Sequence, residues 1–181
     1  MQTLKTVEPA SATGKTRQIF DGIQKALGTV PNLMRALASS PAALNAYMSF
    51  NGALGEGKLP AAFREQLAIA VANANSCDYC LSAHNALGKL AGLSSSALGL
   101  AQKADAEDGK TKAALQFAVE VVRRRGMLSP SEVDTLRKTG FSDGEITEII
   151  AVVAINIFTN YFNHIAGTEI DFPVIHATAA R

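Results

Sequence analysis

Two cysteines and a histidine form the cluster in this sequence that is best suited to chemistry. They are spaced as Cys77-x-x-Cys80-x-x-x-His84, and no other cysteine occurs among the 181 residues. Residues three and four positions apart share one face of a helix, so these side chains are expected to lie together. A thiol pair at this spacing can close to a disulfide, and an imidazole one turn along can accept the thiol proton near neutral pH. The cluster predicts a reversible two-electron switch with its own base.

The residues just before the cluster predict that it opens a helix. Asn75 or Ser76 is expected as the N-cap, which would place Cys77 and Cys80 in the first helical turn. There the unpaired backbone N–H groups and the positive end of the helix dipole favour a thiolate over a thiol. Because the thiolate is the form that attacks, this position favours a reactive cysteine.

Two other interpretations of the cluster stay open. Thiolates and imidazole also bind zinc, so Cys77, Cys80 and His84 are a candidate metal site. The two thiols can also be a purely structural pair. Against zinc, a structural site would need a fourth Cys or His ligand from elsewhere, and no further cysteine is present. We therefore favour redox chemistry.

Outside the cluster, Glu65 is the residue whose role is least decided by the sequence. An acidic residue in the first turn of a helix that starts at Pro60 is favoured by the helix dipole alone, so Glu65 is either an ordinary helix residue or a fourth member of the site. Tyr79 is expected to be a packing or rim residue. His164, near a helix end, and His176, in the C-terminal tail, are expected to be structural.

Composition disfavours several classes of partner. Lys and Arg number 17 against 16 Asp and Glu, a net charge of +1, so no general field attracts nucleic acid or an anionic membrane. The longest apolar run, 149–158, is interrupted by Asn156, which is typical of a buried helix rather than a membrane span. The first eight residues hold no apolar signal segment. We expect a cytoplasmic protein.

Apolar residues recur at intervals of three and four nearly throughout, which predicts an all-α fold with no sheet. Residues 1–14 lack this periodicity and are expected to form a flexible N-terminal arm; residues 15–181 are expected to form one helical domain. The last helix is apolar almost all round, so it should be central or lie at a subunit interface. The predicted helices lie near 16–27, 32–38, 42–50, 61–74, 77–91, 95–103, 110–125, 130–139 and 143–166.

Three of the predicted helix boundaries share one local device, in which a glycine closes a helix and a serine caps the next one. These boundaries are Gly92-Leu-Ser94, Gly126-Met-Leu-Ser129 and Gly140-Phe-Ser142. Two of the serines also have capping-box spacing to a glutamate, as Ser129 with Glu132 and Ser142 with Glu145.

Glu65, followed twelve residues later by the cysteine and histidine cluster, resembles the core motif of the AhpD-like alkylhydroperoxidases, within the carboxymuconolactone decarboxylase superfamily. Two further segments are similar to the peroxidase-related subgroup, and the likeness extends from about residue 20 to residue 175. These segments are Val30-Pro-Asn-Leu33 and Asn163-His-Ile-Ala-Gly-Thr-Glu-Ile-Asp-Phe-Pro173. The resemblance implies an AhpD-like helical bundle that forms a homo-oligomer, commonly a trimer or hexamer, and it implies no bound cofactor.

The resemblance also implies roles for individual residues. Cys80 would be the peroxidatic thiol, Cys77 would resolve the sulfenic acid as a disulfide, His84 would help to deprotonate Cys80 through water, and Glu65 would anchor that relay. The implied function is reduction of alkyl hydroperoxides, with a dithiol such as a lipoyl group as the reductant. One departure is Tyr79, which stands where the best-known peroxidases of this type carry a histidine.

Two alternatives to the peroxidase remain. The cysteine pair could serve a non-enzymatic redox sensor or oligomeric interaction protein, in which closure of the disulfide changes assembly. A decarboxylase-like reaction is the other alternative; it is less favoured because decarboxylases of the superfamily lack the cysteine pair.

Overall fold

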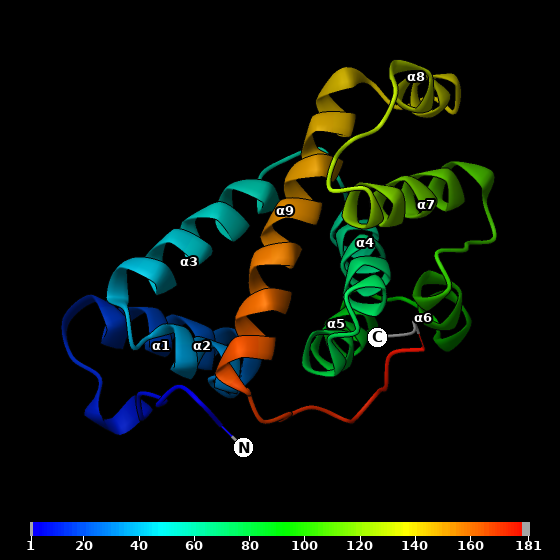
Figure 1. Cartoon of the computed structure of the whole chain (residues 1–181). Helices are drawn as coiled ribbons and strands as arrows, with labels where there is room; N and C mark the ends of the chain where they lie inside the picture. The colour runs from blue at the N-terminus through cyan, green and yellow to red at the C-terminus, as the bar shows by residue number, and fades with distance from the viewer. Residues whose placement is uncertain (1, 179–181) are drawn as a thin grey trace.

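The computed structural model describes residues 2–178, and every regular element in that part of the chain is a helix (Figure 1). The predicted all-α fold is therefore confirmed. The elements are η1 (Pro9–Ser11), α1 (Gly14–Leu27), α2 (Asn32–Leu37), α3 (Pro41–Gly55), α4 (Ala61–Ala74), α5 (Asp78–Leu90), α6 (Ser95–Gln102), α7 (Gly109–Arg123), α8 (Pro130–Lys138) and α9 (Asp143–Ala166).

Local capping signals account for most helix boundaries. Ser129 and Ser142 form the predicted capping boxes with Glu132 and Glu145, in which each glutamate carboxylate also accepts the backbone N–H of its serine. Gly28 ends α1 in the left-handed region with φ of 76°. Glycine is suited to this position because it lacks the Cβ that disfavours positive φ.

The start of α5 differs from the prediction. The N-cap is Cys77 itself, and Asn75 instead closes α4. Ser76 between them has φ of 54°, a left-handed turn that separates the two helices. Asn75 and Ser76 cannot cap α5 because both are used in ending α4 and reversing the chain.

Helices α4 and α9 form the centre of the molecule. α4 packs against α5, α6, α7 and α9, while α9 also packs against α3, α5 and α7. Figure 1 shows α9 crossing the body with α3 on one side and α4 and α7 on the other. Leu67, Ile69 and Val71 of α4 and Ile149 of α9 are fully buried. The expectation that the last helix is central is confirmed, and burial of these side chains supplies the main driving force for folding.

The apolar character of α9 also meets the length and composition of a membrane span, with half of its most apolar window buried. The core helix of a soluble protein passes the same test. Since four other helices pack on α9, its buried apolar residues are used within this chain.

The N-terminal segment, for which the sequence predicted a flexible arm, contacts the body of its own chain. The backbone N–H of Thr3 donates to the carbonyl of Ala166 at 2.7 Å, and that of Val7 donates to the carbonyl of Arg35 at 2.9 Å. Arg35 also pairs with Glu8. These contacts join the segment to the end of α9 and to α2.

The residues after α9 form a C-terminal strap, 167–178, that returns across α5 without forming a helix or strand (Figure 1). The N–H of Ile175 donates to Ser82 Oγ at 2.9 Å, and the N–H of Ala177 donates to Asp78 Oδ1 at 2.9 Å. Asp78 lies between the two cysteines, so the strap is attached directly to the predicted site.

Candidate active site

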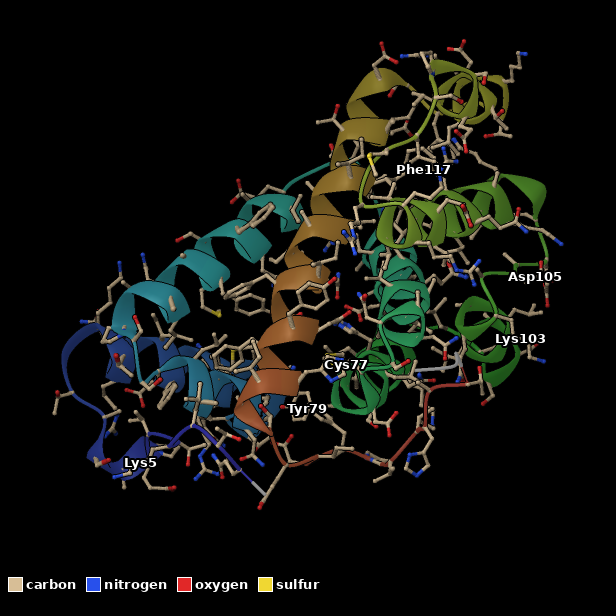
Figure 2. The ribbon with its side chains drawn as sticks, in the orientation of Figure 1. Lys5, Cys77, Tyr79, Lys103, Asp105 and Phe117 are labelled. Atoms are coloured by element: carbon tan, nitrogen blue, oxygen red, sulfur yellow. A yellow bond between two sulfur atoms is a disulfide. The ribbon has the colours of Figure 1, made fainter. Side chains whose placement is uncertain are left out.

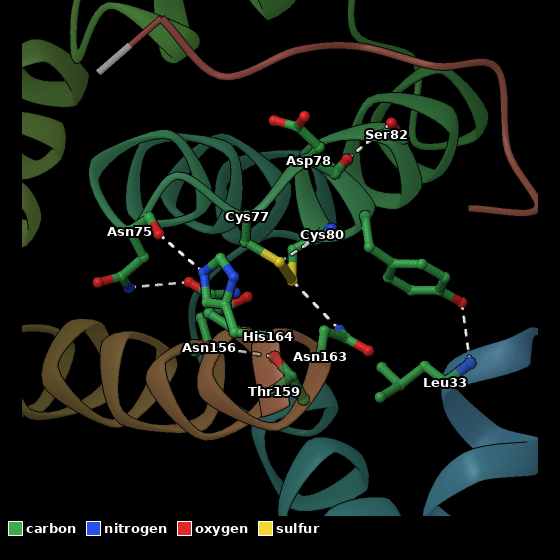
Figure 3. The surroundings of a disulfide bond; sticks show 12 residues. Leu33, Asn75, Cys77, Asp78, Cys80, Ser82, Asn156, Thr159, Asn163 and His164 are labelled. Carbon is green, nitrogen blue, oxygen red and sulfur yellow. Dashed lines mark hydrogen bonds between the residues drawn. A yellow bond between two sulfur atoms is a disulfide. The ribbon is translucent and has the colours of Figure 1, made fainter. Parts of the chain in front are cut away.

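The two cysteines are joined by a disulfide at the N-terminal end of α5, with their Cα atoms 5.3 Å apart (Figure 3). Their residues are 2% and 3% exposed, so the pair lies below the surface. Cys77 Sγ accepts a hydrogen bond from the backbone N–H of Cys80 at 3.3 Å. Both sulfurs therefore sit where the unpaired N–H groups of a helix start favour negative charge, as the sequence predicted.

His84 and Glu65 meet across the interface of α5 and α4. Nδ1 of His84 lies 2.8 Å from Oε2 of Glu65, and the two side chains are 19% and 22% exposed. An ionised carboxylate only accepts hydrogen bonds, so Nδ1 carries the hydrogen and Nε2 is the nitrogen left to accept a proton. The structure thus brings the third and fourth predicted site residues into direct contact.

The position of Glu65 in its helix differs from the one assumed from the sequence. α4 begins at Ala61, so Glu65 lies beyond the first turn, where the field of the helix dipole has fallen off. The dipole therefore does not account for an acidic residue here. The contact with His84 does.

Gly88 allows α5 to approach its neighbours closely, one turn after His84. A Cβ at this position would lie 2.8 Å from Leu98 Cδ2, 3.1 Å from Leu93 Cδ1 and 3.7 Å from Glu65 Cβ. A larger residue would force the ends of the Leu98 and Leu93 side chains to move, whereas the distance to Glu65 Cβ is an ordinary van der Waals contact. The glycine thus lets Leu98 and Leu93 pack closely on α5.

Asn163 of α9 is a site residue to which sequence reasoning assigned no role. Its Nδ2 donates to Cys80 Sγ at 3.3 Å, and the residue is 5% exposed (Figure 3). A signal was present, because Asn156, Asn160 and Asn163 recur at i, i+4 and i+7 in an otherwise apolar helix. That spacing predicts a polar stripe on one face, and all three asparagines are buried.

The same stripe holds the turn that precedes the cysteines. Asn160 Oδ1 accepts a hydrogen bond from Asn75 Nδ2 at 2.8 Å, and His164 Nε2 lies 2.9 Å from the carbonyl oxygen of Asn75. His176 of the strap pairs with Asp78 at 2.9 Å. Both histidines therefore contact the segment around the cysteines.

A small cavity of about 60 Å³ lies beside Cys80. A water needs roughly 10–15 Å³ on this measure, so the space suits a molecule of a few heavy atoms. Cys80 lines the cavity and Cys77 does not. The lining is mainly apolar, and its members are Leu27, Pro31, Leu33, Met34, Tyr47, Tyr79, Cys80, Ala83, His84, Leu87, Thr159, Asn163 and Phe172.

Tyr79, the residue between the cysteines, forms one wall of this cavity. Its hydroxyl accepts the backbone N–H of Leu33 at 3.0 Å, and its ring meets Phe172 of the strap edge to face at 5.9 Å. Figure 2 shows Cys77 and Tyr79 at the end of the molecule where α5 meets the C-terminal end of α9. Tyr79 is a packing residue here, as expected, and it connects the strap to the site.

The two tyrosines of the cavity are held neutral. Burial raises the pKa of Tyr47 to about 12, and the negative charge of Glu65 adds to the effect. Burial likewise raises the pKa of Tyr79, with Asp171 contributing in the same direction. Both phenols therefore face the cavity in their protonated form near neutral pH.

Metal binding was the other chemistry considered for the cluster. Among residues 2–178, no group of three or more His, Cys, Asp or Glu side chains is arranged to hold a metal ion.

Comparisons with known proteins concern the family and the fold of the chain. The sequence model of the carboxymuconolactone decarboxylase family matches residues 41–124, a segment that contains Glu65, both cysteines and His84. A search of curated proteins found no match.

Solved structures with the same fold match a larger part of the chain than the family model does. An alkylhydroperoxidase AhpD core, a peroxidase-related protein from Ralstonia eutropha JMP134, has a TM-score of 0.85 and 25% identity, over 94% of this chain and 92% of its own. A peroxidase-related protein from Silicibacter sp. TM1040 has a TM-score of 0.80 and 26% identity, over 93% and 94%.

A variant of the debrominase Bmp8, in complex with 2,3,4-tribromopyrrole, has a TM-score of 0.80 and 23% identity, over 94% and 93%. At that identity the likeness concerns the fold alone. The family match over residues 41–124 and the AhpD-like neighbours together support the AhpD-like and carboxymuconolactone decarboxylase superfamily for this chain.

Proposed function

We propose that this protein is a thiol-dependent antioxidant enzyme that reduces small alkyl hydroperoxides. One observation carries the proposal. Cys80 is bonded to Cys77, lines a small apolar cavity, and lies one helical turn before His84, which is paired with Glu65. This combination supplies a nucleophile, a partner thiol, a base and a binding space for a small substrate.

The first half-reaction oxidises Cys80. Nε2 of His84 accepts the thiol proton, directly or through water, and Glu65 stabilises the resulting imidazolium. The thiolate attacks the terminal oxygen of ROOH, the O–O bond breaks, and an S–O bond forms. Cys80 becomes a sulfenic acid, and the departing RO⁻ takes a proton from His84 to leave as ROH.

The second half-reaction restores the thiols. Cys77 attacks Cys80 Sγ, the S–S bond forms, and hydroxide leaves as water after it gains a proton. A dithiol reductant then gives two electrons and two protons to the disulfide and is itself oxidised to a disulfide. By the family resemblance we propose a lipoyl-type dithiol for this step.

We also propose that the protein is a cytoplasmic homo-oligomer, a trimer or hexamer. The support is an exposed apolar surface on the outer side of α9, where Ile150, Phe158, Tyr161 and Ile165 are 44–69% exposed. An exposed apolar face of this kind is typical of a subunit interface. Light scattering coupled to size-exclusion chromatography tests the assembly, and a monomer at micromolar concentration would contradict it.

A redox sensor is the second candidate, and one observation favours it. Asp78, between the two cysteines, accepts the N–H of Ala177 and pairs with His176, so the disulfide helix is tied to the C-terminal strap. A sensor of this kind would consume at most one equivalent of peroxide and change its assembly on oxidation.

The test is consumption of tert-butyl hydroperoxide with dihydrolipoamide as the reductant. The wild type is expected to turn over many times. Cys80→Ser is expected to lose turnover by at least about 10²-fold, since the nucleophile is removed. Without reductant, Cys77→Ser is expected to consume one equivalent and stop at the sulfenic acid of Cys80, because the protein then has no second thiol to form a disulfide. Full turnover by Cys80→Ser would refute the peroxidase, and single-equivalent consumption by the wild type would favour the sensor.

A further inference from the structure

The Asn163 side chain presents two different ends to the site. Its Nδ2 donates to Cys80 Sγ at 3.3 Å, whereas its Oδ1 is buried and has no hydrogen-bond partner. Buried amide oxygens in folded proteins are normally paired, so an exception calls for an explanation. One explanation is a bound molecule that supplies the missing donor.

The chemistry of the sulfur decides which way the amide faces. A disulfide sulfur carries no hydrogen and a thiolate carries none either, so in both states Cys80 Sγ can only accept. The NH₂ end of Asn163 must therefore point at the sulfur. Figure 3 shows the amide oxygen directed away from the sulfurs, on the side of Leu33, which lines the cavity.

Two other polar side chains that line the cavity already have partners in the protein. The hydroxyl of Tyr79 accepts from Leu33, and Thr159 Oγ1 donates to carbonyls of its own helix. His84 uses Nδ1 on Glu65, and its Nε2 is the nitrogen assigned to proton transfer. Within residues 2–178, the buried side-chain atoms without a partner are Arg35 Nε, Asn160 Nδ2, Asn163 Oδ1 and Thr168 Oγ1. Of these four residues, Asn163 is the one that lines the cavity.

We propose that Asn163 anchors the substrate: its N–H holds Cys80 Sγ, and its Oδ1 accepts a hydrogen bond from the O–H or N–H of a small, otherwise apolar molecule in the cavity. For hydroperoxides this rests on the proposed function. The terminal O–H of ROOH donates to Oδ1, which brings the terminal oxygen next to the sulfur that the same amide holds. The R group then faces the apolar lining.

This arrangement gives the amide a role in orientation. Cys80 must attack the oxygen that carries the hydrogen, so that RO⁻ is the leaving group. An acceptor beside the sulfur selects that oxygen, because the other oxygen of ROOH has no hydrogen to donate. Alignment of reacting atoms at about 3–3.5 Å is the kind of positioning that raises a rate without new covalent chemistry.

The first experiment measures binding to the disulfide form and needs no turnover. Pyrrole and furan are matched probes, because both are five-membered apolar rings and only pyrrole carries an N–H. We expect the wild type to bind pyrrole more tightly, in titrations followed by nuclear magnetic resonance. Asn163→Leu should weaken pyrrole binding about fivefold to tenfold, as expected for one hydrogen bond, and leave furan unchanged.

Two further variants make the result specific. Asn163→Asp keeps an acceptor oxygen and is expected to retain the preference for pyrrole. Asn156→Leu, which removes a buried amide of α9 that bonds to the carbonyl of Val152, is the matched control and should also retain it. Equal binding of pyrrole and furan by the wild type would overturn the proposal, as would a preference that persists in Asn163→Leu. The comparison of pyrrole with furan in the wild type can overturn the proposal even if a variant fails to fold.

The second experiment measures oxidation of the dithiol form. Asn163→Leu should slow oxidation by tert-butyl hydroperoxide about tenfold more than oxidation by dipyridyl disulfide, an oxidant without an O–H or N–H. Equal slowing with both oxidants would assign Asn163 to the sulfur alone and overturn the substrate contact. If the wild-type thiols do not react with the hydroperoxide, the proposed function fails, while the pyrrole measurement still tests the anchor.

Discussion

The N-terminal ends of α5 and α9 share one capping hydrogen bond but differ in chemistry. At α9, Ser142 Oγ accepts the backbone N–H of Glu145 at 3.3 Å, and at α5, Cys77 Sγ accepts that of Cys80 at 3.3 Å. In α9 the third helical residue, Glu145, reaches back to the N–H of Ser142 at 2.8 Å and completes a capping box. In α5 the corresponding residue is Cys80, which is bonded to its cap.

The difference shows that one cap position can hold two kinds of side chain. Ser142 is exposed and its cap only stabilises a helix, whereas Cys77 is buried and is also bonded to Cys80. Sulfur is a weaker hydrogen-bond acceptor than a hydroxyl oxygen. The cap of α5 is therefore expected to stabilise its helix less than a serine cap would. It also places two thiols where the helix dipole favours thiolates.

The largest expected effect is at Cys77, which is both the disulfide partner of Cys80 and the N-cap of α5. Cys77→Ser and Cys77→Ala should both lower turnover with hydroperoxide strongly and to the same extent, since neither can form the internal disulfide with Cys80. Under reducing conditions the serine variant should be about 1 kcal/mol more stable than the alanine variant, because a hydroxyl accepts the N–H of Cys80 and a methyl group does not. Urea unfolding measures the difference. Equal stabilities would mean that Cys77 contributes no cap.

Next in size is the loss of the carboxylate behind His84. Glu65→Gln should slow oxidation of Cys80 by roughly 10²-fold, because an amide cannot stabilise an imidazolium as a carboxylate does. Stopped-flow measurement of sulfenic acid formation gives the rate. Glu148→Gln is the control: Glu148 accepts the N–H groups of Lys58 and Leu59, away from the cavity, so the rate should stay unchanged. A Glu65→Gln rate equal to that of wild type would remove Glu65 from the relay.

A smaller effect is expected at the structural cap. Ser142→Ala should lower the free energy of unfolding by about 1 kcal/mol and leave the rate of Cys80 oxidation unchanged. Thermal or urea unfolding measures the stability, and the peroxide assay measures the oxidation rate. A change in the oxidation rate would show that the two helix starts are coupled, contrary to the comparison above.

The smallest expected effect concerns the neutral phenol beside Glu65. Folding raises the pKa of Tyr47 from 10.0 to about 12, so above pH 10.0 the unfolded chain loses this proton while the folded chain keeps it. The stability that this tyrosine contributes is fully present below that pH and falls as the pH rises towards 12. Tyr47→Phe should flatten the alkaline decline in urea midpoint. An unchanged slope would show that Tyr47 titrates normally.

Much of the fold could be read from local signals. The ends of α4 and α9 match the prediction at 61–74 and 143–166, and the capping boxes of Ser129 and Ser142 form as expected. Such boundaries are predictable because capping involves residues a few positions apart in the chain. The attachment of the N-terminal segment to α9 was missed because that contact joins distant parts of the sequence.

The sequence by itself determined that Cys77, Cys80 and His84 lie together, since they are on consecutive turns of one chain segment, and helical periodicity is enough to bring them together. Only the tertiary structure placed Glu65 against His84, made Cys77 rather than Asn75 the cap, and brought Asn163 to Cys80 from 83 positions away. The physical reason is that these contacts depend on how α4, α5 and α9 pack, which is set by burial of their shared apolar faces rather than by spacing along the chain.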